Sequence, residues 1–322
     1  MPTLAINGGS PVRSTQFPDW PVHDQREKIG DVAAENTKIE GRGVGERRER
    51  RHDPPGVLMR MSRALLAVAI ALLLAASAMA QVRRFGFGGP RYRDFKPYPN
   101  VPYDGRFAFV RVIYECDASG YWYRGQPSWA HGYPMAEQNL MRIMNEVSFL
   151  GAHEEITTLT LDDPEIFKYP VIYIIEVSWW QLTDTQANAL RAYLHKGGFV
   201  IVDDFKAYGD FGSPGWEPFE ANMKRVLPEA RFYEMQGSHP IFHSFFEINN
   251  LDIVPQAYNA GRPIFRGIYE DNDQSKRLMM IVNYNTDVSQ YWEWSGTGLR
   301  PIDDTNEAYK LGVNYLVYGL TH

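Results

Sequence analysis

The chain has 322 residues, with 33 lysines and arginines, 39 aspartates and glutamates, and a net charge of −6. This acidic balance argues against a nucleic-acid partner, because binding phosphate requires a basic face. The single cysteine, Cys116, excludes a disulfide framework within the chain and a zinc cluster of cysteines.

Residues 59–80 have the three-part layout of a secretory signal peptide. A basic start, residues 59–63, precedes an apolar run, residues 64–76, and a small-x-small cleavage site lies before Gln81. The apolar run is shorter than the roughly 20 residues that a membrane-spanning helix needs. A core helix is the competing interpretation, and no cysteine follows the cleavage site to support a lipoprotein anchor. We therefore expect an exported protein, periplasmic or extracellular, whose mature chain starts at Gln81 and has no membrane span.

Residues 1–58 lie upstream of this expected signal peptide. The segments LAINGG and FPDWP make residues 4–24 similar to the N-terminus of sugar aminotransferases that use pyridoxal phosphate. Nothing downstream is similar to the lysine region that binds the cofactor, so we do not expect an aminotransferase. Residues 41–55 are polar and rich in arginine, which is typical of disorder. We expect residues 1–58 to be a non-native or disordered extension.

From residue 81 onwards, an irregular arm, residues 81–106, precedes one α/β domain, residues 107–322. Strands are predicted from alternating or continuous apolar runs, and helices from apolar residues at helical spacing. The predicted strands are 107–114, 156–161, 171–175, 199–202, 230–233, and a pair, 264–269 and 277–284, around a polar turn. The predicted helices are 136–149, 183–196, 216–226 and 307–318. This alternation favours a three-layer sandwich with a mostly parallel sheet.

The centre of the domain is a helix, a glycine turn and a buried strand. Thr183 and Gln186 have the spacing of a capping box, and Gly197-Gly198 ends the helix. The apolar run 199–202 is typical of a strand covered on both faces, and it leads into Asp203-Asp204. Parallel sheets bind ligands at this carboxyl edge, so these acids are candidates for a functional site.

Several short motifs resemble one bacterial family when they are taken as a set. They are Phe167-Lys168-Tyr169-Pro170, residues 190–199 with Asp203-Asp204, His239-Pro240-Ile241-Phe242, residues 283–287 and residues 311–314. Together they are similar to the domain of unknown function 4159 family, over nearly all of residues 107–321. The resemblance implies the flavodoxin-like fold of class I glutamine amidotransferases and of trehalose-utilisation-type domains.

Relatives of this fold with amidotransferase activity carry a nucleophilic cysteine on a turn after a central strand. Here that strand leads into Asp203-Asp204 instead, and Cys116 follows the first predicted strand. A reactive thiol needs a lowered pKa and a nearby base, and neither is visible beside Cys116. We expect a buried structural cysteine and no glutamine hydrolysis.

Acidic residues follow three of the predicted parallel strands, whose carboxyl ends share one edge of the sheet. They are Glu115, Asp117, Glu176, Asp203 and Asp204. Converging carboxylates bind a hard cation such as calcium or magnesium, or raise one pKa so that the group acts as an acid or base. The alternative is that each acid caps a helix or pairs with a cation such as Lys206. We select Asp203 and Asp204 as candidate catalytic residues and the other three as candidate ligand-binding residues.

Histidines and tryptophans supply further candidates. His239 lies in a loop and is a candidate base or ligand for the acids, although a loop histidine bonded to backbone is the plainer interpretation. His243 follows at a weak metal-ligand spacing, while His131 and His153 lie in no recognisable pattern. Trp179 and Trp180 are adjacent, so on a strand only one faces the core and the other is a candidate platform for a sugar ring. Trp292 and Trp294 are candidates for the same role, with core packing as the alternative.

These features favour an exported binding or assembly module of the cell envelope, with a carbohydrate or an envelope protein as its partner. The alternative is a metal-assisted or Asp/His hydrolase that acts on an envelope glycan. A divalent cation is the one cofactor that the acidic edge suggests, and no other is predicted.

Overall fold

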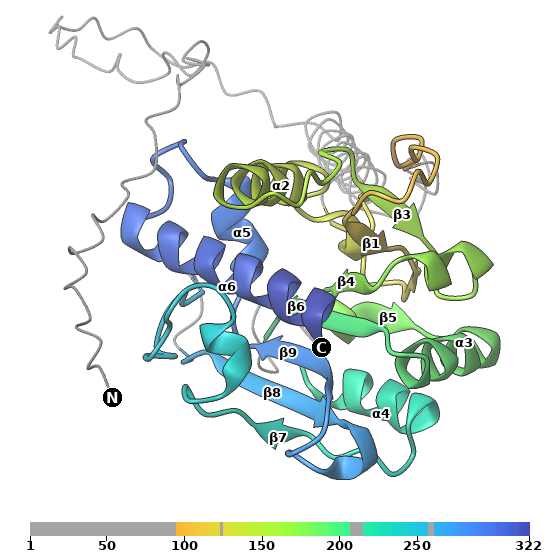
Figure 1. The fold of residues 1–322 in the computed structure, drawn as a ribbon. Coiled ribbons are helices and arrows are strands. Elements are labelled where there is room, and N and C mark those ends of the chain that lie inside the picture. Colours follow the sequence, from red (N-terminus) through yellow and green to blue (C-terminus); the bar gives the residue numbers. More distant parts are fainter. Residues whose placement is uncertain (1–94, 123–124, 207–214, 257–260) are drawn as a thin grey trace, which may run out of the picture. The chain divides into compact units, whose positions relative to one another are not determined.

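The computed structural model describes residues 95–322 apart from 123–124, 207–214 and 257–260 (Figure 1). The expected signal peptide, residues 59–80, and the aminotransferase-like residues 4–24 lie outside the described residues. Among the described residues, no helix is long and apolar enough to cross a membrane.

A seven-stranded, mostly parallel sheet forms the framework of the domain, as the sequence predicts. In sheet order its strands are β3 (Thr157–Leu159), β1 (Val110–Val112), β4 (Val171–Ile175), β6 (Phe199–Phe205), β9 (Leu278–Tyr284), β8 (Ile264–Tyr269) and β7 (Tyr233–Glu234). The first five are parallel, and β8 and β7 each run antiparallel to the preceding strand. A separate pair joins β2 (Glu115–Cys116) to β5 (Trp180–Gln181).

Five α-helices and five short 3₁₀ helices connect the strands in the described part of the chain. The α-helices are α2 (Met135–Val147), α3 (Asp184–His195), α4 (Glu217–Val226), α5 (Val288–Glu293) and α6 (Ile302–Thr321). The 3₁₀ helices are η2 (Ser128–Ala130), η3 (Pro164–Lys168), η4 (Val177–Trp179), η6 (Pro240–His243) and η7 (Glu270–Asn272). Helix α6 is longer than its prediction, 307–318, because it begins directly after Pro301, and α5 was not predicted at all.

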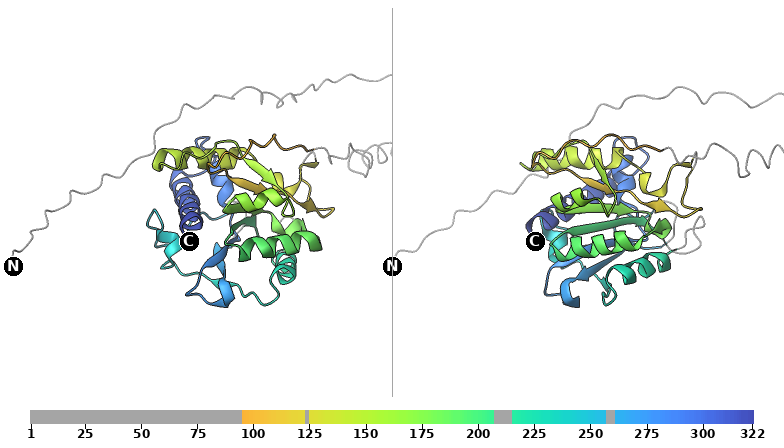
Figure 2. Two further views of the ribbon diagram at one scale, coloured as in Figure 1. Left: turned by 45° about the vertical axis from the view of Figure 1, so that its right-hand side comes forward. Right: turned by 90° about the vertical axis from the view of Figure 1, so that its right-hand side faces the viewer.

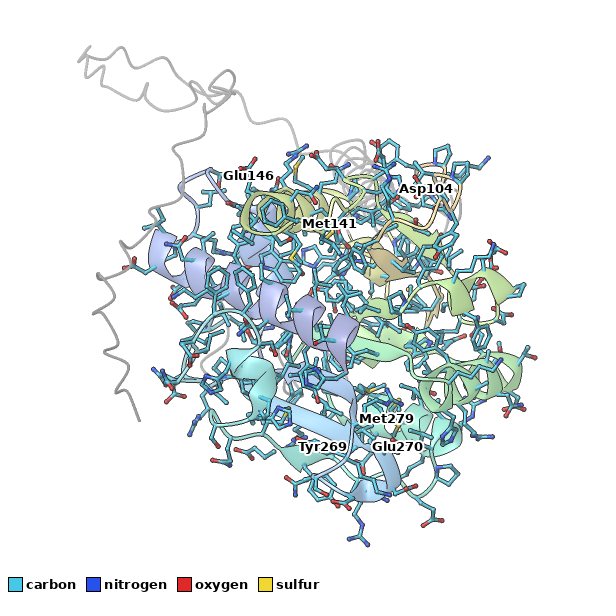
Figure 3. The ribbon with its side chains drawn as sticks, in the orientation of Figure 1. Asp104, Met141, Glu146, Tyr269, Glu270 and Met279 are labelled. Carbon is cyan, nitrogen blue, oxygen red and sulfur yellow. The ribbon has the colours of Figure 1, made fainter. Side chains whose placement is uncertain are left out.

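Two hydrophobic cores cover the two faces of the sheet, because alternate residues of a strand point to opposite sides. Phe199 and Ile201 of β6 belong to a core built with α2, α5 and α6, whereas Val200 and Val202 belong to one built with α3 and α4. The helices can be followed from two further directions in Figure 2. In Figure 3, Met141 marks the first core and Met279 the second.

The predicted helix–turn–strand unit at the centre is present. Thr183 accepts a hydrogen bond from the Gln186 backbone N–H, and the Gln186 side chain accepts one from the Thr183 N–H. Gly197 adopts a φ of 102°, which only glycine reaches without strain, and this turn leads into β6. The strand does not end at residue 202, as predicted, but continues through both aspartates to Phe205. Its pairing with β9 is irregular between Val202 and Phe205.

The strands at the two edges of the sheet are short. Strand β3 has three residues and β7 has two. On the outer side of β3, the side-chain amide of Asn100 donates to the Thr158 carbonyl and accepts from the Thr158 N–H, both at 2.8 Å. The amide of Asn100 therefore occupies the backbone groups that a further strand would use.

Candidate functional site

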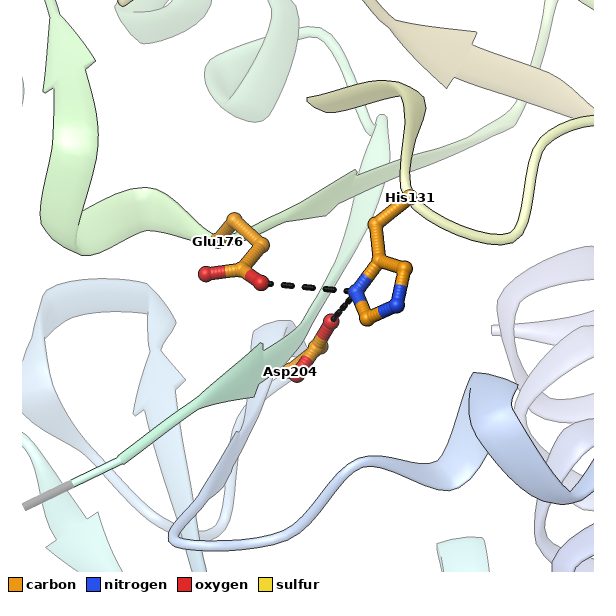
Figure 4. Close-up of side chains that lie close together, drawn as sticks. All are labelled: His131, Glu176 and Asp204. Atoms are coloured by element: carbon orange, nitrogen blue, oxygen red, sulfur yellow. Dashed lines mark hydrogen bonds and ion pairs between the residues drawn. The ribbon is translucent and has the colours of Figure 1, made fainter. Parts of the chain in front are cut away.

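Loops at the carboxyl edge of the sheet bring four titratable side chains together. Glu176 directly follows β4, Asp204 lies near the end of β6, and Asp287 follows β9 and caps α5. His131 comes from the loop between η2 and α2. Figure 4 shows the imidazole of His131 facing the carboxylates of Glu176 and Asp204.

The Nδ1 atom of His131 is the centre of this cluster. It lies 3.1 Å from Oδ2 of Asp204, within hydrogen-bonding distance, and 3.4 Å from Oε1 of Glu176. The side chains of Glu176 and Asp204 are only 3% and 1% exposed, whereas that of His131 is 30% exposed. The partly exposed imidazole of His131 therefore lies between the solvent and the buried carboxylates of Glu176 and Asp204.

The backbone at both carboxylates is unusual. Glu176 and Asp204 adopt φ values of 53° and 52°, in the left-handed region that residues other than glycine avoid. The Glu176 N–H donates to the carbonyls of Asp203 and Asp204. In addition, the Tyr114 hydroxyl donates to the Glu176 carbonyl at 2.9 Å. Such conformations cost about 1–3 kcal/mol each, and here hydrogen bonds between neighbouring segments hold them.

A buried ion pair positions the loop that carries His131. Arg111, in the middle of β1, is fully buried and its Nε donates to Glu137 of α2 at 2.5 Å. Its Nη1 donates to the carbonyls of Trp129 and His131, at 2.8 and 3.3 Å. Arg111, on strand β1, therefore holds the backbone carbonyl of His131 in place through a hydrogen bond.

Asp203 is adjacent to Asp204 in the chain but has different partners. It accepts hydrogen bonds from the Tyr173 hydroxyl at 2.7 Å, from the Asn283 amide at 3.1 Å and from the Ser289 N–H at 3.1 Å. Burial and the charge of Asp287 raise the pKa of Asp203 to about 7, against these hydrogen bonds. Its contacts make it an anchor for the start of α5.

Burial and mutual charge shift the pKa values of the cluster. Burial alone lowers the pKa of His131, but the Asp204 hydrogen bond and the Glu176 carboxylate raise it well above its usual value. Burial and then the charge of Glu176 raise the pKa of Asp204. Burial and then the charge of Asp204 raise the pKa of Asp287 to about 7. The cluster thus places several carboxylates close together where burial disfavours their negative charge.

Several oxygens of the cluster lack a hydrogen-bond partner among the described residues. They are Oδ1 of Asp204, Oε1 of Glu176 and Oδ2 of Asp287. Asp287 uses its other oxygen to accept from the Gln290 N–H at 2.9 Å and from the Ser289 hydroxyl at 3.0 Å. Buried carboxylate oxygens are rarely left unpaired, so this edge is suited to a cation or to a ligand that donates hydrogen bonds.

The other predicted acids, Glu115 and Asp117, lie apart from the cluster. Glu115 is exposed on β2 and lines a cleft of about 500 Å³. The side chain of Asp117 accepts from the Ser119 N–H at 2.7 Å. Of the five predicted acids, only Glu176 and Asp204 meet around His131.

His239 does not join the acids. Its ring lies 5.8 Å from that of Tyr269 and 6.0 Å from that of Tyr318. Tyr269 pairs with Leu278 at the start of β9, which is the opposite edge of the sheet from Asp204. The Nδ1 of His239 accepts from the Ile241 N–H, as an N-cap of η6. His239 is therefore a loop histidine that is bonded to backbone, which is the plainer of the two interpretations in the sequence analysis.

The remaining candidates are placed as follows. His243 pairs with Glu247 at 2.6 Å. Trp180 is buried against Tyr114, and Trp179 is half-buried in η4, so neither forms an exposed platform. The Trp292 indole is buried and donates to the Ala308 carbonyl, whereas Trp294 is 36% exposed.

Cys116 is buried, as expected for a structural cysteine. Burial raises the pKa of its thiol to about 11, which disfavours the thiolate that a nucleophile needs.

Sequence reasoning missed His131 and Asp287. Nothing local distinguishes His131, since its partners are 45 and 73 residues further along the chain. Asp287 had a signal, because Asp287 and Gln290 have the capping-box spacing that was used for Thr183 and Gln186.

Fold and site together define an α/β domain with a mostly parallel sheet and a buried His–carboxylate cluster at its carboxyl edge. The chain belongs to the family described as domain of unknown function (DUF4159), which matches residues 106–320 and confirms the resemblance. No curated protein matches the chain significantly.

Proposed function

We propose that the protein is an exported binding module of the cell envelope with a carbohydrate ligand. We further propose that its domain is a three-layer, flavodoxin-like sandwich of the class I glutamine amidotransferase type. The two cores on the two faces of the sheet support this fold assignment. Export rests on residues 59–80, and a mature N-terminus at Gln81, found by mass spectrometry of the secreted protein, would support it. A terminus upstream of Met59 would overturn it.

The cleft near Glu115 is the observation that carries the carbohydrate proposal. It lies where β1 and β3 end, since Glu115 follows β1 and Asp162 follows β3. Its lining combines an exposed aromatic ring, that of Tyr121, with polar side chains, including Glu115 and Asp162. Sugar rings bind by stacking on aromatic faces while their hydroxyls form hydrogen bonds, so this mixture suits them.

The test is a titration of the full chain with envelope oligosaccharides, followed by calorimetry. Glu115→Gln is expected to weaken binding about tenfold or more, since a hydrogen bond to a charged group contributes roughly 1.5–3 kcal/mol. Tyr121→Ala is expected to weaken it as well, through loss of stacking. Trp294→Ala is the matched control, because this partly exposed aromatic residue does not line the cleft. Equal affinity in all variants, or no binding of any sugar, would contradict the proposal.

A second candidate function, an Asp/His hydrolase acting on an envelope glycan, is favoured by the His131–Asp204 hydrogen bond. This hydrogen bond holds Nδ1 of His131, while Nε2 has no hydrogen bond among the described residues. This is how a carboxylate orients a histidine for acid–base catalysis. A hydrolase would lose turnover in Asp204→Asn while keeping its fold, whereas a binding module shows no turnover at all.

A further inference from the structure

We propose that His131, Glu176 and Asp204 bind a divalent transition-metal ion, with Zn²⁺ and Mn²⁺ as the candidates. The proposal concerns the buried cluster and not the cleft, so it stands or fails independently of carbohydrate binding.

The spacing of the three side chains fits a metal ion. One ligand atom from each, Nδ1 of His131 and one carboxylate oxygen of Glu176 and of Asp204, lie within 4.8 Å of one another. The two distances from Nδ1 are 3.1 and 3.4 Å. A tetrahedral ion with bonds of about 2.1 Å holds its ligands about 3.4 Å apart. The separations of Nδ1 from the two carboxylate oxygens therefore already match those of ligands on one ion.

Unpaired oxygens provide a second, independent indication. Asp204 and Asp287 are 1% exposed and Glu176 is 2% exposed, yet each has one oxygen without a hydrogen-bond partner among the described residues. A single proton on His131 satisfies Oδ2 of Asp204 and leaves the Glu176 oxygen at 3.4 Å unbonded. An ion at this position would contact both carboxylates at once, which one N–H cannot do.

The charges of the cluster also favour a cation. Three buried carboxylates, those of Glu176, Asp204 and Asp287, are opposed by His131 and by the buried Lys206, whose charge acts on Asp204. Lys206 also interacts with other groups of the protein. A divalent ion beside these carboxylates would offset the negative charge that burial otherwise disfavours.

The chemistry of the ligands selects the class of ion. Calcium and magnesium prefer oxygen ligands throughout, whereas an imidazole nitrogen suits zinc and the two carboxylate oxygens also suit manganese. Three protein ligands leave at least one coordination position for water or another molecule, as in catalytic rather than structural zinc sites.

The backbone contacts around the cluster would keep these ligands in place. Arg111 fixes the carbonyl of His131, and the Glu176 N–H bonds to the carbonyl of Asp204. Ligands held in this way lose little freedom when an ion binds, which favours affinity.

The experiment uses the full chain without an affinity tag, stripped of metal with EDTA. Calorimetric titration with Zn²⁺ and with Mn²⁺ is expected to give one ion per chain. Asp204→Asn and Glu176→Gln are each expected to weaken binding by about tenfold or more, since changes even in the groups around a metal have effects of 10- to 100-fold. Cobalt added to the stripped protein provides a spectrum that reports nitrogen and oxygen ligation directly.

His243→Gln is the matched control, because His243 also has a carboxylate beside its Nδ1, but with Glu247 at the surface. It is expected to leave the affinity unchanged. Binding that is lost in His243→Gln but kept in Glu176→Gln, or no binding at micromolar metal, would overturn the proposal. If Asp204→Asn fails to fold, Glu176→Gln and the cobalt spectrum of the unaltered chain still decide the outcome.

Discussion

Asp203 and Asp204 show how far two adjacent side chains differ once the strand is built. Strand β6 is irregular between Val202 and Phe205, and Asp204 adopts a left-handed conformation with a φ of 52°, so the two carboxylates meet different neighbours. Asp203 bonds to Tyr173, Asn283 and the start of α5, whereas Asp204 faces His131. One therefore stabilises the fold, and the other is available for chemistry.

This difference predicts effects of different size on stability. The variant Asp203→Asn replaces one carboxylate oxygen by an N–H₂ group, which cannot accept the hydrogen bonds that Asp203 accepts in the folded protein. We expect this variant to have a free energy of unfolding about 2 kcal/mol lower. Asp204→Asn removes a buried charge with an unpaired oxygen but weakens the contact with His131. We expect a net change below about 1 kcal/mol in metal-free protein, because these two effects oppose each other. Urea denaturation of both variants is the measurement, and equal losses would contradict the assignment.

His239 predicts a pH dependence that is separate from the acidic edge. Burial, and then the nearby His322, lower the pKa of His239. The unfolded chain therefore binds more protons than the folded chain as the pH falls below 6.5, the ordinary histidine value. The contribution to stability is present above pH 6.5 and is lost as the pH falls through the lowered pKa.

The variant His239→Asn isolates this effect, because asparagine is a good N-cap but does not titrate. Urea denaturation at pH 7.5 and 5.5 should show a smaller loss of stability at low pH in the variant than in the unaltered chain. An identical pH dependence in the two proteins would count against a lowered pKa.

Two of the three carboxylates of the cluster were predicted from sequence, but Asp287 and the histidine were not. Glu176 and Asp204 directly follow apolar runs, and the rule that parallel strands share a carboxyl edge places them together. His131 lies in a loop of Trp, Gly and Pro residues, and its backbone carbonyl is held by Arg111, a charged residue inside an apolar strand. Neither residue is visible as part of a site until the strands are arranged in space.

At the scale of elements, the Arg111–Glu137 pair joins β1 to α2 and supports the His131 loop. Removal of one partner leaves a buried charge without compensation, so Glu137→Leu should cost about 3–5 kcal/mol. The double variant Arg111→Met, Glu137→Leu should recover much of that loss, since apolar residues often replace a buried ion pair without penalty. Thermal and urea unfolding measure both effects.

The double variant also tests positioning, because it removes the hydrogen bond from Arg111 to the His131 carbonyl. We expect its stability to recover while its affinity for the ion does not. Glu154→Gln is the control. It breaks the exposed pair with Arg142, at 3.0 Å, and should change stability by less than about 1 kcal/mol. Full recovery of ion affinity in the double variant would show that Arg111 has no positioning role.

Elements with caps or clear apolar patterns were predicted, whereas α5, β2 and β5 were not. Helix α3 carries its capping box and terminal glycine in the sequence. Helix α5 has six residues, too few for an apolar period, although Asp287 caps it. Strands β2 and β5 have two residues each, and only their pairing in space identifies them.

At the scale of the whole molecule, the three proposed ligands come from positions 131, 176 and 204. Because the unfolded chain does not bring them together, an ion that binds them stabilises only the folded state. At about 100 times its dissociation constant an ion adds roughly 2.7 kcal/mol, a rise of about 5–10 °C in the unfolding midpoint. Thermal scans of the full chain with Zn²⁺ and with EDTA test this, and Asp204→Asn should show at most about half of that rise at the same ion concentration, because its affinity is at least about tenfold lower.

The class of fold followed from the sequence because strand and helix patterns alternate over residues 107–322. The positions of the cleft and of His131 did not follow, since both depend on loops whose paths are set by tertiary contacts. Glu115 illustrates this limit. It follows a parallel strand as Glu176 does, yet a two-residue pairing with Gln181 directs it into the cleft and away from the cluster.

The Asn100 amide on strand β3 has a consequence for the behaviour of the protein at high concentration. An open sheet edge offers unpaired backbone groups on which the strand of another molecule can add, and aggregation then spreads from edge to edge. Here the outward N–H and carbonyl of Thr158 are already bonded to Asn100, and the strand at the other edge has only two residues. One side chain from outside the sheet thus protects the β3 edge against self-association.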